Sequence, residues 1–223
     1  MSQVRRAQNK TLDIQIRSGA VMLPGELTIP SEAQGVVLFA HGSGSSRHSP
    51  RNQFVAKTIR DAGVGTLLFD LLTKDEESID RYTRHLRFDI SLLAERLVDA
   101  TSWIEGDNDF YDLHVGYFGS STGGGAALVA AAQKGDAVGA VVSRGGRPDL
   151  AGNALSQVKS PTLLIVGGLD YPVIEMNRGA FEQLNCKKEM KIVPGASHLF
   201  EEPGTLEQVA RLAAGWFQTH LNT

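Results

Sequence analysis

Gly119-Ser120-Ser121-Thr122-Gly123 is the stretch of this sequence that decides the fold. The apolar run LHVGYF (113–118) precedes it, and the alanine-rich run GGAALVAAA (124–132) follows it. This spacing predicts a strand, a sharp turn and a helix, the context in which Gly-x-Ser-x-Gly carries a nucleophile. The helix would point its free N–H groups at the turn and favour developing negative charge there. We therefore predict that Ser121 is a nucleophile, against the alternative of a plain Gly/Ser-rich turn.

Apolar runs of the same kind recur on both sides of this stretch and are typical of strands buried on both faces of a sheet. We expect such buried strands at residues 35–40 and 64–69, and further strands at 113–118, 138–142, 161–166 and 189–193. Apolar residues at helical spacing predict helices at 52–62, 86–104, 124–132, 172–184 and 206–217. Strands that alternate with helices predict an α/β fold, with a mostly parallel, doubly wound sheet flanked by helices.

The remaining segments complete this outline. Residues 12–16 and 21–29 predict an antiparallel pair at the edge of the sheet, where Pro24 is tolerated. Residues 73–82 are polar without a clean period and predict a surface loop, which together with the residues up to 87 can lean over a site. Residues 143–160 are too few for a cap domain, so we expect an open site.

Composition narrows the class of protein. The 223 residues are 42% hydrophobic with a net charge of -3, which fits a single domain over 1–223 and does not suggest nucleic acid. The single cysteine, Cys186, excludes an internal disulfide and fits a reducing compartment, and no His/Cys cluster suggests a metal. Residues 1–10 predict a flexible N-terminus without a leader pattern, and no apolar stretch is long enough for a membrane span. We expect a cytoplasmic protein, with the oligomeric state left open.

A serine nucleophile needs a base, and the base needs an acceptor that fixes its tautomer. His198 follows the last predicted strand, whereas His220, the other downstream histidine, lies near the C-terminus. Asp170 follows the strand at 161–166, so the predicted carboxyl-end turns bring it to the same sheet edge as Ser121 and His198. We predict Asp170 as the acid that orients His198. Its competitors are Asp70, Asp149 and Glu175.

An oxyanion on the substrate needs two N–H donors. We predict the backbone of Thr122, directly after the nucleophile, and that of Ser43 in the turn after strand 35–40, with Gly42 as the alternative. His41, just before that turn, favours a structural hydrogen bond over a role as base or ligand.

Arg144 and Arg147 lie on a loop at the same edge. With Gly42 they are the candidates for contact with a substrate, and either guanidinium can hold a carboxylate or phosphate. The alternative, which we favour, is that the two arginines pair with nearby acids such as Asp149 or face water.

His41-Gly42-Ser43-Gly44, the Ser121 turn, Gly168-Leu169-Asp170 and Ser197-His198 together resemble the α/β-hydrolase superfamily over nearly the whole chain. The size and strand layout are similar to the dienelactone hydrolase-like branch. Dienelactone hydrolases proper carry cysteine at the nucleophile position, where this chain has Ser121. The resemblance therefore implies an α/β-hydrolase fold without a cap domain, and a serine hydrolase of small carboxylic esters that works through an acyl-enzyme without metal or cofactor.

Two other interpretations stay open at this point. The same triad suits an acyltransferase, a thioesterase, a lactonase or an amidase. A protein of a different class, which binds a small ligand in the pocket of this fold without catalysis, would also carry these residues, because a fold alone does not fix a function.

Overall fold

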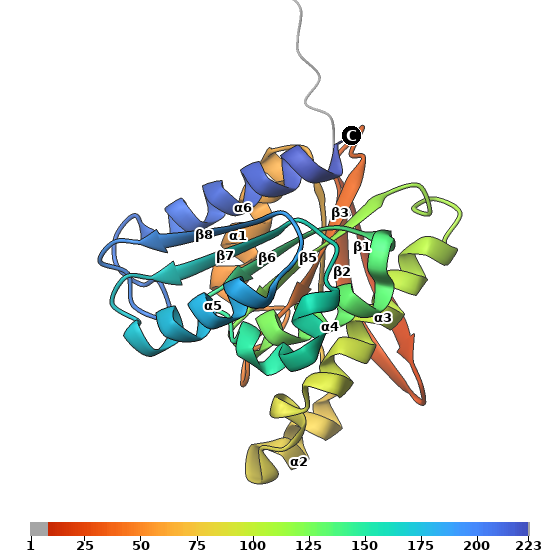
Figure 1. Ribbon diagram of the computed structural model, residues 1–223. Coiled ribbons are helices and arrows are strands. Elements are labelled where there is room, and N and C mark those ends of the chain that lie inside the picture. Colours follow the sequence, from red (N-terminus) through yellow and green to blue (C-terminus); the bar gives the residue numbers. More distant parts are fainter. Residues whose placement is uncertain (1–8, 223) are drawn as a thin grey trace, which may run out of the picture.

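The computed structural model describes residues 9–222 (Figure 1). Its centre is one continuous eight-stranded sheet in the order β1-β2-β4-β3-β5-β6-β7-β8. The β1–β2 and β2–β4 pairs are antiparallel, and the pairs from β4 through β3 to β8 are parallel. The strands are β1 (Lys10–Ser18), β2 (Val21–Ile29), β3 (Gly35–Ala40), β4 (Gly65–Phe69), β5 (His114–Ser120), β6 (Val138–Arg144), β7 (Thr162–Gly167) and β8 (Lys188–Val193). The predicted α/β fold with a mostly parallel sheet is confirmed.

Helices cover both faces of the sheet (Figure 1). One apolar layer joins the sheet to α1 and α6, and the other joins it to α3, α4 and α5. The α-helices are α1 (Pro50–Asp61), α2 (Lys74–Thr83), α3 (Ile90–Gly106), α4 (Thr122–Lys134), α5 (Tyr171–Gln183) and α6 (Thr205–Leu221). The short 3₁₀ segments are η1 (Leu86–Phe88), η2 (Gly135–Ala137) and η3 (Pro148–Gln157).

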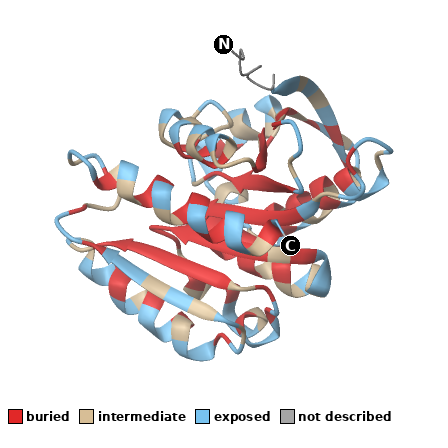
Figure 2. Ribbon diagram, turned by 90° about the horizontal axis from the view of Figure 1, so that it is seen from above, coloured by how far each residue is buried: buried red, intermediate tan, exposed pale blue. Residues whose placement is uncertain are grey.

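Burial follows the two-faced sheet that the apolar runs predict. All six residues of β3 are buried, and every residue of β5 except His114 is buried. Figure 2 shows the central strands buried along their length, while the helices alternate between buried and exposed positions. Each large apolar side chain removed from water stabilises the fold by about 1.5–3 kcal/mol, so these two strands anchor the turns at their carboxyl ends.

The predicted loop at residues 73–82 is wrong, because this segment forms α2. The Thr73 side chain accepts a hydrogen bond from the Glu76 N–H, and the Glu76 carboxylate accepts one from the Thr73 N–H. Arg96 on α3 donates to both carboxylate oxygens of Glu76. A helix held by a capping box and an ion pair needs no apolar stripe, which explains the missing period. Figure 1 shows α2 projecting from the body of the molecule.

Three smaller expectations also need comment. The long helix starts at Ile90, after an N-cap by Asp89, and residues 86–88 form the separate turn η1. The β1–β2 pair lies at the sheet edge as predicted, but the edge strand itself is β1. Pro24 in β2 lies one position beyond the last β2–β4 pair, where its carbonyl accepts from the Asp70 N–H at 3.1 Å, so its missing N–H falls at the end of that ladder.

Two further predictions concern the segment between β6 and β7 and the N-terminal residues 1–10. Between β6 and β7 the chain forms only η3, so no cap domain is inserted there. Of the predicted flexible N-terminus, residues 1–8 lie outside the described residues, and Lys10 already belongs to β1. Among residues 9–222, no helix combines the length and the apolar character that crossing a bilayer requires.

Candidate active site

Ser121 occupies the sharp turn between β5 and α4. Its φ is 53° and its ψ is -123°, a backbone conformation that residues with a side chain rarely adopt. Such strain costs on the order of 1–3 kcal/mol and persists only where the surroundings hold the residue in place. Here the Ser121 N–H donates to the Arg144 carbonyl at 3.3 Å, and the Ser121 carbonyl accepts from Gly124 and Arg147 at 3.0 Å each. The turn is therefore fixed from both sides.

The glycines that flank the turn are required by close packing. A Cβ at Gly119 would collide with the backbone of Gly123, and a Cβ at Gly123 would collide with the carbonyl of Ala40. The absence of a Cβ at these two glycines therefore lets α4 approach β3 and β5 closely. The N-terminus of α4 points at the turn as a result.

His198 and Asp170 meet across two loops at the same edge of the sheet. His198 Nδ1 lies 2.6 Å from Asp170 Oδ2. The Asp170 side chain is 13% exposed and the His198 side chain 39% exposed, so the carboxylate lies behind the ring. An Nδ1–H that donates to this carboxylate leaves Nε2 as the basic nitrogen of the ring.

The loop that carries His198 is held by several contacts. The Ser197 N–H donates to the Glu202 carboxylate at 3.0 Å. The Leu169 N–H, next to Asp170, donates to the Ala196 carbonyl at 2.9 Å and so ties the two loops together. These contacts keep the acid and the base in register.

Gly145 lies between His198 and the serine turn. A Cβ added at Gly145 would lie 3.1 Å from the His198 carbonyl oxygen and 3.6 Å from His198 Nδ1. The carbonyl of the preceding residue, Arg144, accepts the hydrogen bond from the Ser121 N–H. Within residues 9–222, no hydrogen bond joins Ser121 Oγ to His198. In unliganded sites such bonds are often long and tighten when substrate binds. Ser121, His198 and Asp170 therefore lie at the same edge of the sheet, but no hydrogen bond joins the serine to the histidine among the described residues.

The predicted oxyanion donors lie beside the serine. A Cβ at Gly42 would stand 3.0 Å from Ser121 Cβ, and the Ser43 hydroxyl lies 3.1 Å from that of Thr122. Thr122 opens α4, so its N–H has no partner inside the helix. In the described part of the chain no hydrogen bond takes up the N–H of Ser43 or Thr122. Both N–H groups are therefore left without an acceptor among the described residues.

His41 has the structural role that the sequence favours. The Leu71 N–H donates to His41 Nε2 at 3.0 Å, and Nδ1 lies 3.1 Å from the Gly42 carbonyl. Burial lowers the pKa of His41, so the ring is neutral at pH 7 with its proton on Nδ1. A neutral ring in this position fixes the start of the turn that carries Gly42 and Ser43.

The competing acids all have other partners. Asp70 pairs with Arg47, Asp149 with Arg147 at 2.7 Å and Glu175 with Arg178 at 2.6 Å. The competing base, His220, packs edge-on against Trp216 on α6. Asp170 is thus the carboxylate that the structure joins to His198.

The two candidate substrate arginines differ, because Arg147 is paired, whereas Nε and Nη1 of the buried Arg144 have no hydrogen-bond partner among the described residues. The Arg147 guanidinium forms a two-pronged pair with Asp149, the local pairing that the sequence favours. Arg144 is 7% exposed, donates to the Asn52 side chain at 3.4 Å and lies over the Phe200 ring. Burial lowers the pKa of Arg144 to about 10. Neither side chain lines the cavity beside the serine turn.

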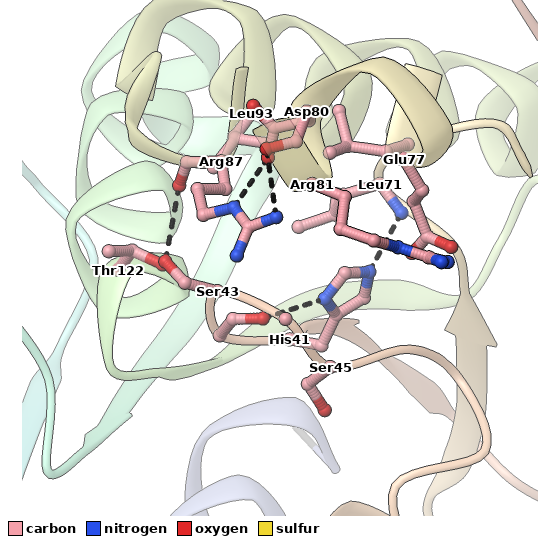
Figure 3. Close-up of a pocket in the computed structure, with 13 residues that line it drawn as sticks. His41, Ser43, Ser45, Leu71, Glu77, Asp80, Arg81, Arg87, Leu93 and Thr122 are labelled. Atoms are coloured by element: carbon pink, nitrogen blue, oxygen red, sulfur yellow. Dashed lines mark hydrogen bonds and ion pairs between the residues drawn. The ribbon is translucent and has the colours of Figure 1, made fainter. Parts of the chain in front are cut away.

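A cavity lies beside the serine turn, and the segment at residues 73–87, which the sequence predicts can lean over a site, supplies part of its wall. The cavity encloses about 250 Å³ beside Thr122, between the turn after β3 and α2. Figure 3 shows Asp80, Arg81 and Arg87 above the loop that carries His41. The Arg87 Nε donates to Asp80 Oδ2 at 2.5 Å. The signal that could have found this wall is Thr-x-x-Glu at residues 73–76, the capping box that starts α2.

The fold and the serine turn define an α/β-hydrolase, and the comparisons with known proteins narrow this class. Residues 23–221 match the family model described as "Dienelactone hydrolase family". The chain belongs to the dienelactone hydrolase family. A crystal structure described as dienelactone hydrolase from Anabaena variabilis ATCC 29413 is 61% identical, with a TM-score of 0.94, and the match covers 96% of this chain and 99% of that one.

Two further comparisons concern the fold and the length of the chain. Est1E from Butyrivibrio proteoclasticus shares the fold, with a TM-score of 0.78 at 15% identity over 95% of this chain and 99% of that one. A Mycobacterium tuberculosis protein from strain H37Rv, provisionally named a phosphoribosyl transferase, is 57% identical over 94% of this chain. This chain spans only 46% of that protein's length. The family that the chain belongs to is described as one of hydrolases.

Proposed function

We propose that this protein is a serine hydrolase of small carboxylic esters, with Ser121, His198 and Asp170 as its triad. The observation that carries the proposal is the 2.6 Å contact between His198 and Asp170 at the sheet edge where Ser121 is held at a positive φ. A serine in this turn presents its hydroxyl above the sheet, and a histidine oriented by a carboxylate is the base it needs.

The reaction follows from these positions. Ser121 Oγ attacks the acyl carbon while His198 Nε2 takes the hydroxyl proton, and the N–H groups of Thr122 and Ser43 hold the oxyanion. When the tetrahedral intermediate collapses, the bond to the alkoxide breaks and His198 returns the proton to that oxygen. Water then attacks the acyl-enzyme with the same base, releasing the acid and restoring Ser121. Asp170 stabilises the charged His198 in both halves.

A lactone is a second candidate substrate, because the relative with 61% identity is described as a dienelactone hydrolase. A lactone is a cyclic ester, and its hydrolysis uses the same attack and the same proton transfers. The leaving alkoxide then stays attached to the acyl group. Open-chain and cyclic esters are therefore to be assayed side by side.

The name of the Mycobacterium tuberculosis relative is not carried to this chain. The chain matches less than half of that protein's length, so the named activity can belong to the part without a counterpart here. The groups at the sheet edge are those of acyl transfer: a serine, a histidine paired with a carboxylate, and two free N–H donors.

Labelling with a fluorophosphonate tests the proposal, because this probe reacts with an activated serine. Intact-mass analysis should show one adduct on the wild type and none on Ser121→Ala or His198→Ala. His220→Ala is the matched control and should label like the wild type. No adduct on folded wild type, with both a large and a small probe, would instead support a protein that binds a ligand in this pocket without catalysis.

A further inference from the structure

The groups of the proposed reaction lie on the two sides of β5. In the sheet, β3 and β4 lie on one side of β5, and β6, β7 and β8 lie on the other. Asp170 and His198 follow β7 and β8, whereas the cavity is bounded by the turns after β3 and β4 and by α2. Ser121, at the end of β5, therefore separates the base from the cavity.

This placement orients a bound ester. The leaving oxygen must lie within hydrogen-bond reach of His198 Nε2, because the base returns its proton to that atom. The oxyanion must face the N–H groups of Ser43 and Thr122, two residues that also line the cavity. The tetrahedral carbon has four bonds, and those to Ser121 Oγ, to the leaving oxygen and to the oxyanion are already placed. The fourth bond leads to the acyl substituent, and the space beside the oxyanion donors that can receive this substituent is the cavity.

We propose that the cavity beneath α2 is the acyl site, and that the enzyme selects esters by their acyl group while the alcohol group lies in the open. This inference rests on the proposed serine esterase function. The residues around the acid and the base support the open alcohol side: Leu169 is 53% exposed, Tyr171 68% and Leu199 40%. A surface of this kind contacts an alcohol group without enclosing it.

The walls of the cavity define the acyl group. Its apolar part comes from Leu71, Leu72 and Leu93, all of them buried. A volume of about 250 Å³ is below the usual range for drug-sized ligands, so the site suits a small acyl group.

The charges on the cavity wall balance. The charged residues that line it are Glu77, Asp80, Arg81 and Arg87. Arg87 donates from Nε to the Asp80 carboxylate and from Nη2 to the Asp80 carbonyl, so this pair is internally neutralised. Two acids and two arginines carry no net charge, so the wall offers no net attraction to an anion. The proposed site therefore favours an uncharged acyl group.

The test is a matrix of esters assayed by kcat/KM. One series lengthens the acyl group from acetyl to octanoyl on p-nitrophenol, and the other varies the alcohol of the best acyl group among leaving groups of matched pKa. We expect kcat/KM to fall by roughly tenfold or more once the acyl chain exceeds the cavity, the scale that a few methylenes reach in an apolar pocket. The alcohol series should vary by less. A succinate half-ester should be at least about tenfold poorer than the butyrate ester, since it would bring an unpaired charge into the cavity.

Variants of the wall separate this proposal from a general loss of activity. Leu93→Ala should move the acyl optimum to longer chains, and Leu93→Phe should move it to shorter ones. Tyr82→Ala, on α2 but 87% exposed and outside the residues that line the cavity, should leave the acyl profile unchanged. Thermal unfolding shows which variants are folded.

Three results would overturn the acyl assignment: an alcohol series steeper than the acyl series, an acyl profile unchanged in both Leu93 variants, or a preference for the half-ester. If Ser121 still takes the fluorophosphonate in that case, only this inference fails. If Ser121 does not react, the proposed function itself fails.

Discussion

His198 Nδ1 and Asp170 Oδ2 lie 2.6 Å apart, although 28 residues separate them in the chain. The parallel sheet explains this contact, because β7 and β8 are neighbours and each residue follows the carboxyl end of its strand. The contact indicates that Nδ1 carries the proton and that Nε2 is the basic nitrogen of the ring. The contact is therefore the part of the site on which the proposed chemistry most depends.

Asp170→Asn should remove the acceptor that fixes the His198 tautomer and lower kcat for ester hydrolysis. In serine proteases the equivalent change costs about 10⁴-fold, and we expect at least about 10²-fold here. Steady-state kinetics on the purified, folded variant provide the measurement. Asp149→Asn is the control, because Asp149 pairs with Arg147 rather than with the histidine. Equal losses in the two variants would argue against Asp170 as the orienting acid.

Gly42→Ala should misplace the oxyanion turn against the serine. The new Cβ would lie 3.0 Å from Ser121 Cβ and 3.1 Å from the Ser120 carbonyl oxygen, so the turn must shift. A shift of about 1 Å in catalytic groups can cost about 10²-fold in rate, and because contacts of this length need a smaller shift, we expect a loss in kcat of about tenfold. Gly179→Ala, in α5 with open space around it, should leave kcat unchanged. A fully active Gly42→Ala enzyme would exclude this turn from the oxyanion site.

The pH dependence of stability should report on His41. Burial lowers the pKa of His41 from 6.5 in the folded protein, so the unfolded chain binds the proton more readily. This group therefore contributes stability above about pH 6.5 that is lost as the pH falls below that value. Urea unfolding at pH 7.5 and pH 5.5 should show a smaller drop for His41→Gln than for the wild type. The exposed His85, changed to Gln, should retain the full drop, and the same behaviour in both variants would contradict this role.

Glu76→Ala should destabilise the protein by removing both the capping box of α2 and the partner of Arg96. The Arg96 side chain is 4% exposed, so its charge would be left buried without its carboxylate. Breaking a buried pair in this way typically costs about 3–5 kcal/mol, which chemical denaturation measures as the free energy of unfolding. Asp75→Asn, an exposed change in the same helical turn, should cost much less. If the two changes cost the same, α2 is not anchored by this pair.

The sequence predicted the parts of the molecule that depend on apolar burial. A strand such as β3 reads as a continuous apolar run because both of its faces are covered, and its carboxyl end then locates His41, Gly42 and Ser43. Ser121, Asp170 and His198 each follow a predicted strand, and the fold brings these three strand ends to one edge of the sheet. The roles of these residues in catalysis stay predictions.

Polar anchoring explains what the sequence did not show. The α2 helix is held by the Glu76–Arg96 and Asp80–Arg87 pairs, and such contacts leave no apolar period to detect. The sequence therefore indicated that this segment can lean over the site, but not that it does so as a helix. Arg144 illustrates another gap, because a residue at a strand end can face either layer, and only the packed structure shows it against Asn52 and Phe200.

The measurement that tests the serine esterase mechanism most directly is the trapping of an acyl-enzyme. Wild-type protein would be mixed with p-nitrophenyl butyrate, quenched in acid within the first turnovers, digested and mapped by mass spectrometry. We predict a butyryl group on the peptide that contains Ser121, formed with a burst of nitrophenol, and no such group in Ser121→Ala. Turnover of the ester without a burst and without any acylated peptide, or with the acyl group on another residue, would contradict the mechanism.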